Sequence, residues 1–250
     1  MQYRILLTLL ILSFIVPSCN NDKEGIPCDS FEWGYEDEEG PTHWGRCFAE
    51  CDGSSQSPLD IDDPVPDAVL TALELHYDEV PIDVTNNGHT IEFEYETGSI
   101  LTLNGLSFNL LQFHFHTESE HTLDGQHFPM EVHLVHKHDA TGQLAVIGVF
   151  LEEGTENVFL QNFSDNLPAV KDGFFTSSVP VNVADLLPAD QGYYTYSGSL
   201  TTPPCSETVI WFVMRTPVEA SASQIQKFHD ILHDNNRPVQ SLNGRQIKEF

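Results

Sequence analysis

The sequence predicts one mostly β domain of the α+β class, with short helices around its strands. Two observations support this prediction. Strand-like alternation of apolar and polar residues recurs along the chain, whereas helical spacing is confined to residues 156–167 and 221–235. The 250 residues suffice for one large domain, and no internal repeat or low-complexity segment divides them.

The predicted strands are short runs separated by turn signals. Asn86-Asn87-Gly88-His89 is a turn signal, and Asn104-Gly105 after an apolar run predicts a hairpin. A continuous apolar run, expected of a buried strand, lies at residues 144–151. Including that run, the clearest predicted strands cover residues 73–77, 91–95, 100–103 and 144–151.

Helical spacing is found in two stretches. Between residues 156 and 167, apolar side chains recur at every fourth position. Between residues 221 and 235, Ile225, Phe228 and Leu232 share one helix face. Pro238 follows the second stretch and is typical of the chain beyond a helix end.

The most informative residues are three histidines on two predicted strands. Side chains of a strand alternate between faces, so His114 and His116 share one face while the phenylalanines beside them take the other. His133 lies on the next strand. Three imidazoles with one open position form the ligand set of a catalytic zinc. The alternative is ordinary buried strand histidines; the H-x-H spacing and the third histidine favour Zn²⁺.

Two polar residues stand next to these histidines on the same strand faces. Gln112 lies two residues before His114, and Glu131 lies two residues before His133. A ligand histidine usually donates its second ring N–H to such a group, which fixes its tautomer and orientation. Gln112 and Glu131 are therefore the candidate orienting residues.

The charge balance excludes nucleic acid as a partner. Ten Lys and Arg against 38 Asp and Glu give a formal charge of −28, which would repel phosphates. Removing residues 1–18 removes one Arg and no acid, so the remaining charge is 9 − 38 = −29. The acidity is interpreted as a solvated surface; adaptation to high salt is the alternative.

The first 18 residues are typical of a secretion signal. Residues 5–16 form an almost wholly apolar run that is short for a membrane span. The sequence Val16-Pro17-Ser18-Cys19 resembles a bacterial lipoprotein cleavage box, which predicts cleavage before Cys19 and its lipidation. Residues 19–30 would then be a tether and residues 31–250 the catalytic domain. A plain signal peptide with an unlipidated Cys19 is the alternative.

The cysteines agree with export to an oxidising compartment. Five are present, and assigning Cys19 to lipid leaves Cys28, Cys47, Cys51 and Cys205. Four cysteines allow three pairings, and the residues alone do not choose among them.

The motifs identify a family. The segment Ser119–Leu123, then Phe128 and Glu131–Val135, resembles the signature of the alpha-class carbonic anhydrases, in an exported bacterial form. The resemblance extends along the exported chain through Trp33–Tyr35, Gln56–Pro58, Asn87–His89, Gln112–His116, Ser199–Pro204, Trp211 and Arg237-Pro238. It implies a single domain with a large, twisted, mainly antiparallel central sheet, short surface helices, and zinc at the base of a conical cleft.

The resemblance implies a role for each matching residue. His114, His116 and His133 would be the zinc ligands. Thr201 would accept a hydrogen bond from zinc-bound hydroxide and direct its own proton at Glu120. That arrangement aims the hydroxide at CO2 and rejects anions that lack a proton.

Further residues follow from the same resemblance. Thr202 would contact bicarbonate, and Val135, Val146 and Leu200 would form the apolar wall where CO2 rests, with plain core packing as the alternative for these three. His121 would support the site by hydrogen bonding.

The implied reaction is zinc-dependent reversible hydration of CO2 to bicarbonate and a proton, by attack of zinc-bound hydroxide. His89 matches the proton-shuttle histidine, and a surface turn histidine is the alternative. Glu92 stands where the family often has a neutral amide lining the cleft, and its charge could disfavour bicarbonate.

The resemblance also suggests a disulfide between Cys51 and Cys205, which leaves Cys28 with Cys47. Two other functions remain open: a non-catalytic binding module on the same fold, or a periplasmic zinc-binding protein. Bacterial relatives are often homodimers, although no interface signature is found. The predicted location is periplasmic or cell-surface, with membrane attachment only through the lipid at Cys19.

Overall fold

The computed structural model describes residues 27–96 and 98–250. The predicted signal peptide, Cys19 and most of the predicted tether therefore lie outside the described residues. The chain divides into two compact units, one ending at Phe31 and one running from Glu32 to Phe250. The second unit coincides with the predicted domain of residues 31–250 except for Phe31, and it contains every residue of the candidate metal centre.

Strands dominate the domain. They are β1 (Asp60–Ile61), β2 (Val65–Pro66), β3 (Glu74–His76), β4 (Val80–Asn86), β5 (Ile91–Glu94), β6 (Ile100–Leu103), β7 (Leu106–His116), β8 (Thr122–Leu123), β9 (Met130–Lys137), β10 (Leu144–Glu153), β11 (Phe174–Val181), β12 (Tyr193–Gly198), β13 (Val209–Met214), β14 (Val218–Ala220) and β15 (Lys248–Glu249).

The helices are short and most are single 3-10 turns. They are η1 (Cys28–Ser30), which belongs to the first unit, η2 (Asp37–Glu39), η3 (Pro41–Arg46), η4 (Ala49–Asp52), α1 (Val158–Gln161), η5 (Val183–Leu186) and α2 (Ala222–Leu232).

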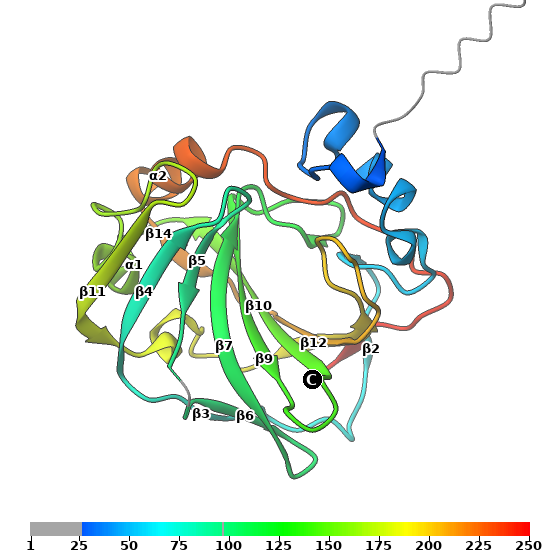
Figure 1. Ribbon diagram of the computed structural model, residues 1–250. Coiled ribbons are helices and arrows are strands. Elements are labelled where there is room, and N and C mark those ends of the chain that lie inside the picture. Colours follow the sequence, from blue (N-terminus) through cyan, green and yellow to red (C-terminus); the bar gives the residue numbers. More distant parts are fainter. Residues whose placement is uncertain (1–26, 97) are drawn as a thin grey trace, which may run out of the picture. The chain divides into compact units, whose positions relative to one another are not determined.

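Thirteen of the strands form one sheet, with the order β11-β4-β5-β7-β9-β10-β13-β12-β15-β2 along its main path. Figure 1 shows β4, β5, β7, β9 and β10 side by side in this order. Most neighbours in the described chain pair antiparallel, whereas β10–β13, β10–β14 and β15–β2 are parallel. The predicted mostly β fold with a large, mainly antiparallel sheet is confirmed.

The two helix predictions had different outcomes. Helix α2 agrees with the helix predicted between residues 221 and 235. Ser221 and Gln224 form a capping box at its start, and it ends at His233, where φ is +54°. The first was wrong in length: α1 covers four residues only. Asn162 explains the early end, since its side-chain amide donates to the carbonyl oxygen of Phe159 at 3.0 Å. Such local bonds compete with helix continuation.

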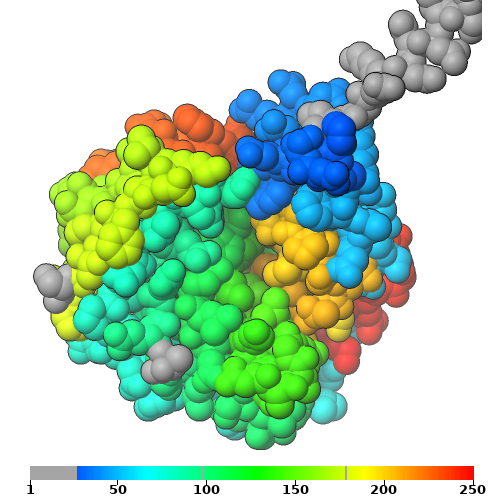
Figure 2. Space-filling view, in the orientation of Figure 1, coloured from blue at the N-terminus to red at the C-terminus, as the bar shows by residue number. Residues whose placement is uncertain are grey.

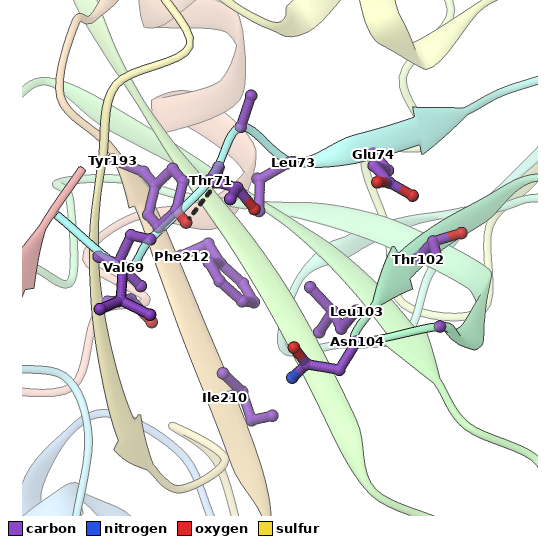
Figure 3. Close-up of a pocket in the computed structure, with 14 residues that line it drawn as sticks. Val69, Thr71, Leu73, Glu74, Thr102, Leu103, Asn104, Tyr193, Ile210 and Phe212 are labelled. Atoms are coloured by element: carbon purple, nitrogen blue, oxygen red, sulfur yellow. Dashed lines mark hydrogen bonds between the residues drawn. The ribbon is translucent and has the colours of Figure 1, made fainter. Parts of the chain in front are cut away.

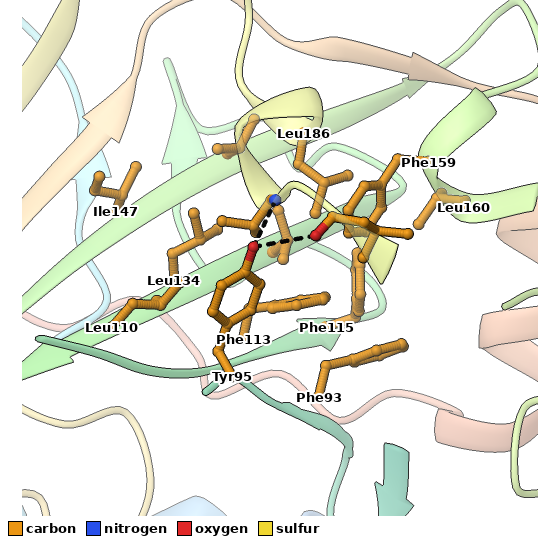
Figure 4. Close-up of a cluster of buried hydrophobic side chains, with 14 of the residues drawn as sticks. Phe93, Tyr95, Leu110, Phe113, Phe115, Leu134, Ile147, Phe159, Leu160 and Leu186 are labelled. Atoms are coloured by element: carbon orange, nitrogen blue, oxygen red, sulfur yellow. Dashed lines mark hydrogen bonds between the residues drawn. The ribbon is translucent and has the colours of Figure 1, made fainter. Parts of the chain in front are cut away.

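The two faces of the central sheet have different apolar clusters. Phe93, Phe113 and Phe115 are buried on one face, where Phe93 and Phe113 stack with ring centroids 4.6 Å apart. Figure 4 shows these rings beside Tyr95, whose hydroxyl donates to the carbonyl oxygen of Val181. Burying each phenylalanine stabilises the fold by about 1.5–3 kcal/mol. Because this face is filled by phenylalanines, strand alternation commits the neighbouring histidines to the opposite face.

Across the described residues, 27–96 and 98–250, no helix combines the length and apolar character that crossing a membrane requires.

Candidate metal centre

The pairing of β7 with β9 brings the three histidines together. Their antiparallel register places His114 directly opposite His133. The ring of His116 lies 5.1 Å from that of His114 and 4.6 Å from that of His133, measured between centroids. His116 and His133 are each only 1% exposed. One nitrogen from each ring lies within 4.8 Å of the other two, which is close enough for the three to hold one metal ion.

Two of the rings have one nitrogen occupied by a protein acceptor. His114 donates from Nδ1 to Oε1 of Gln112 at 2.8 Å. His116 donates from Nδ1 to the backbone carbonyl oxygen of Asn235 at 2.8 Å. These acceptors set the tautomer, so Nε2 of each ring carries a lone pair. Nε2 of His116 is buried and has no hydrogen-bond partner among the residues that the structure describes.

The third ring has the opposite tautomer. His133 donates from Nε2 to Oε1 of Glu131 at 3.0 Å, which leaves Nδ1 with the lone pair. The predicted placement of Gln112 beside His114 and of Glu131 beside His133 agrees with these bonds. Each ring therefore turns one unprotonated nitrogen towards the other two.

Glu131 is the centre of the supporting hydrogen bonds. Its Oε1 accepts from Nδ1 of His121 at 2.7 Å as well as from His133, and its Oε2 accepts the backbone N–H groups of Glu120 and His121, both at 2.9 Å. Burial raises its pKa, but the charges and hydrogen bonds of His121 and His133 outweigh burial and hold the pKa of Glu131 well below the ordinary value. His121, Glu131 and His133 also meet the spacing of a metal site. Their polar atoms are already used by one another, so the described residues favour a single ion.

The electrostatics of two of the three histidines favour the neutral ring. Burial, followed by the charges of His116 and His133, holds the pKa of His114 well below its ordinary value. Burial also lowers the pKa of His116. The neutral imidazole is the form that binds a metal, so both rings are in the required state at neutral pH. For His133, burial lowers the pKa, but the charge and hydrogen bond of Glu131 outweigh burial and raise it.

Glu120 lies beside the unprotonated nitrogens. Its Oε1 accepts the backbone N–H of Arg237 at 2.8 Å. Its Oε2 lies 3.6 Å from Nε2 of His116 and 3.9 Å from Nδ1 of His133. Within residues 27–96 and 98–250 this oxygen has no hydrogen-bond partner. The hydrogen bond expected from Thr201 to Glu120 is therefore not formed with Oε2 in this structure, and that buried oxygen remains available to a donor.

The loop after β12 carries the two candidate threonines. Thr201 is buried, and Thr202 lines the same cavity as His114 and His116. A turn closed by the N–H of Cys205 and the carbonyl oxygen of Thr202 holds the loop, as does the disulfide between Cys51 and Cys205 that the resemblance suggested. Cys28 and Cys47 are also disulfide-bonded, and their pairing with each other stays a prediction.

The three candidate CO2-wall residues belong to one apolar cluster. Val135 and Val146 face each other across β9 and β10, and Trp211 of β13 is the partner of Val146 on the other side. Leu200 packs against the same cluster. The cluster is separate from the phenylalanine core, so an apolar wall lies on the histidine face of the sheet.

His89 follows the predicted turn at the mouth of the cavity. The side-chain oxygen of Asn87 accepts the backbone N–H groups of His89 and Thr90, both at 2.9 Å, and Gly88 has φ of +90°. The imidazole stacks on the indole of Trp33, with centroids 3.7 Å apart and planes 10° apart. The chain thus holds His89 in the same cavity as His114 and His116.

The surface is hollowed where these residues meet. Figure 2 shows a depression between the green strands of the central sheet and the yellow-orange segment near residue 200. The cavity that includes His114 and His116 has a volume of about 120 Å³. A separate cavity of about 440 Å³ lies between residues 69–74 and β12–β13 (Figure 3). Among the described residues that line it, Glu74 alone is a histidine, cysteine or carboxylate residue, so the cavity lacks the cluster of ligands that a metal site needs.

A protein-family model of the eukaryotic-type carbonic anhydrases matches residues 39–250. The chain belongs to this family. It is 44% identical over 224 residues to a carbonic anhydrase of Klebsiella pneumoniae, and the match covers 87% of this chain and 90% of that protein. This family member therefore spans nearly the full length of its relative.

Solved structures of the family have the same fold. A hyperthermostable carbonic anhydrase from an active hydrothermal vent chimney matches with a TM-score of 0.84 and 45% identity, over 88% of this chain and 100% of that one. The alpha-carbonic anhydrase of Thermovibrio ammonificans, solved with the inhibitor sulfanilamide, matches with a TM-score of 0.84 and 41% identity, over 87% and 98% of the two chains.

Sequence reasoning missed three contacts of this carbonic anhydrase site. Asn235 accepts from His116, the backbone of Arg237 donates to Glu120, and Tyr196 places its hydroxyl 2.7 Å from Nε2 of His121. Two of these contacts use backbone atoms, which leave no signature in a residue pattern. Arg237 was noted only as part of the family resemblance.

Proposed function

We propose that this chain is a zinc carbonic anhydrase, which hydrates CO2 reversibly to bicarbonate and a proton. One observation carries the proposal: one nitrogen from each of three histidines lies within 4.8 Å of the other two, beside a cleft whose other residues match the family. The match to the carbonic anhydrase family over residues 39–250 supports the reaction.

The donor set fits Zn²⁺. Three neutral imidazoles with an open fourth position are the ligands of a catalytic zinc, and a buried lone pair without a partner on His116 is costly unless something binds it. His114 and His116 would bind through Nε2 and His133 through Nδ1. When bound, Zn²⁺ lowers the pKa of water to about 7 and so supplies a nucleophile at neutral pH, a known property of this family and not a value from this structure.

Thr201 and Glu120 would orient the nucleophile. Oε2 of Glu120 has no partner and lies beside two of the proposed ligands, so it is suited to accept the hydroxyl proton of Thr201. A threonine that donates to a carboxylate can only accept at its remaining lone pairs. Thr201 would therefore select a nucleophile that carries a proton and aim it at the carbon of CO2.

The substrate and product would occupy different sides of the cleft. CO2 is nonpolar, and Val135, Val146 and Leu200 would offer it an apolar surface. Bicarbonate is polar, and the Thr202 hydroxyl lies in the cavity that His114 helps to form. The product would leave once water replaces it.

His89 would carry the released proton to solvent. Burial and then the charge of Lys171 lower the pKa of His89, so the imidazole is neutral and able to accept a proton at neutral pH. In weak buffer, turnover should rise with pH through this lowered pKa, at a pH below the ordinary ~6.5 of histidine.

His89→Ala is expected to lower kcat in weak buffer by roughly tenfold or more, with kcat/KM for CO2 nearly unchanged, because proton removal follows the hydration step. Stopped-flow rates with increasing imidazole measure this, and imidazole should restore kcat. His138→Ala, which removes a turn histidine bonded to Thr141 outside the cleft, is the matched control. An unchanged kcat for His89→Ala in weak buffer would exclude the shuttle role.

The two alternative functions, a binding module and a zinc-binding protein, would not require all the features of this site. A binding module would not require three converging lone pairs, and a zinc-binding protein would not require an apolar wall. Stopped-flow measurement of CO2 hydration by the zinc-loaded protein tests the proposal. We expect CO2 hydration well above the uncatalysed rate. A zinc-loaded protein without activity would refute the proposed carbonic anhydrase function.

We also propose export and a lipid anchor at Cys19. The four disulfide-bonded cysteines support an oxidising compartment, periplasmic or at the cell surface. Cys19→Ala is expected to move the protein from the membrane fraction to the soluble fraction after cell lysis, measured by immunoblot. Membrane retention of the Cys19→Ala protein would show that the anchor is something else.

A further inference from the structure

Glu92 places a carboxylate in the cleft that the proposed mechanism does not use. It lies on β5, directly opposite His114 of β7. The cavity it lines, of about 120 Å³, also includes His89, His116 and Thr202. Glu92 is therefore a neighbour of both the proposed metal ligands and the proposed bicarbonate contact.

Within the part of the chain that the structure describes, the carboxylate of Glu92 has no compensating partner. Its side chain is half-buried, and no hydrogen bond or ion pair within residues 27–96 and 98–250 includes it. Glu131, in contrast, accepts four hydrogen bonds at the same site. Burial and then the nearby Glu94 raise the pKa of Glu92, as expected for a carboxylate without a partner. A costly, unpaired charge in a small cavity acts most strongly on whatever else enters that cavity.

The two forms of the substrate respond differently to such a charge. CO2 is neutral and has no net interaction with a carboxylate, whereas bicarbonate is an anion and is repelled. We propose that Glu92 is a specificity-determining residue that lowers the affinity of the cleft for bicarbonate and other small monovalent anions, while CO2 binds unhindered. This inference rests on the proposed carbonic anhydrase function.

The expected size follows from Coulomb's law. A unit anion at roughly 7 Å from a carboxylate, in an effective dielectric of about 40, loses about 3- to 10-fold in affinity. The equilibrium constant of the reaction is fixed, so kcat/KM must change equally in both directions. The informative quantities are therefore anion affinities set against the KM for CO2.

The chain offers a matched control. Glu94 lies two residues along β5 on the same face, but it is exposed and lines a different cavity, with Asp83 and Glu96. Glu92→Gln and Glu94→Gln remove the same charge, so only a local effect distinguishes them. Both variants should be zinc-loaded and compared at about pH 8, where carboxyl groups are ionised, and at constant ionic strength.

The test measures inhibition of CO2 hydration by bicarbonate and by nitrate, together with the Kd of nitrate from calorimetry on the same zinc-loaded proteins. For Glu92→Gln we expect both inhibition constants and the nitrate Kd to fall about 3- to 10-fold, with the KM for CO2 unchanged. For Glu94→Gln we expect no change in any of them.

Two results would overturn the inference about Glu92. The inference fails if the inhibition constants and nitrate Kd of Glu92→Gln equal those of the unchanged protein. It also fails if these constants fall equally in Glu94→Gln, which would indicate a general charge effect. Absence of CO2 hydration by the unchanged protein would instead refute the proposed function, so the two failures are distinguishable.

Discussion

His116→Ala is expected to abolish zinc binding and, with it, CO2 hydration. His116 is 1% exposed, and its Nε2 is the buried lone pair without a partner. Loss of a group that only orients a ligand costs 10- to 100-fold in metal affinity, so loss of a ligand itself should cost roughly 100-fold or more. Zinc content after dialysis, with stopped-flow rates on the same samples, measures the effect.

His136→Gln is the matched control for that substitution. His136 lies on β9 and, like His116 of β7, is a buried histidine, but it faces the other side of the sheet, where it bonds to the hydroxyl of Tyr77 at 2.8 Å. Burial lowers its pKa to about 4, so it is neutral at working pH. The control should keep its zinc and its activity. A His116→Ala protein that retains both would remove His116 from the ligand set.

Arg237→Ala is expected to lower the free energy of unfolding by about 3–5 kcal/mol. The guanidinium is buried, and it donates from Nη1 to the side chain of Gln56 and the carbonyl oxygen of Ser57, and from Nη2 to the carbonyl oxygen of Cys51. It also lies over the ring of Trp44, 5.5 Å from the centroid. Removing it takes the guanidinium donor from the buried carbonyl oxygens of Ser57 and Cys51, and within the described chain it leaves Oε1 of Gln56 with only the long 3.4 Å bond from the Ser199 hydroxyl. Urea unfolding at neutral pH measures the change.

Arg215→Ala is the control that removes an arginine charge from an exposed position, in the same urea unfolding measurement. Arg215 pairs with Asp190 at 3.1 Å and Glu249 at 3.0 Å, but its side chain is 40% exposed. Exposed ion pairs contribute about 0–1 kcal/mol, so this control should unfold at nearly the original urea concentration. Equal losses in the two variants would show that burial of Arg237 does not decide its contribution.

The metal centre was largely predictable because strand alternation has a period of two. Once Phe113 and Phe115 are assigned to the core, His114 and His116 have no other face to occupy. The same rule placed Gln112 beside His114. The overall fold followed from the family resemblance more than from the residue patterns, which predict strands but not their order in a sheet.

The rest depends on contacts between distant parts of the chain. The carbonyl oxygen of Asn235 orients His116, which lies 119 residues away in the sequence. The backbone N–H of Arg237 donates to Glu120, which lies 117 residues away. Any residue type has these backbone atoms, so no motif reveals them. The length of the helix at residues 156–167 was overestimated for a local reason. The spacing of apolar residues does not reveal that the Asn162 side chain bonds to the backbone of Phe159 and so competes with continuation of the helix.

Titration of Zn²⁺ into the chelated protein, with CO2 hydration followed by stopped flow, tests the central claim most directly. The chelated protein should be inactive. Activity should then rise in proportion to added zinc and level off at about one ion per chain, since the three histidines form one ligand set. Activity that persists without zinc, or a zinc-saturated protein that does not hydrate CO2, would contradict the account.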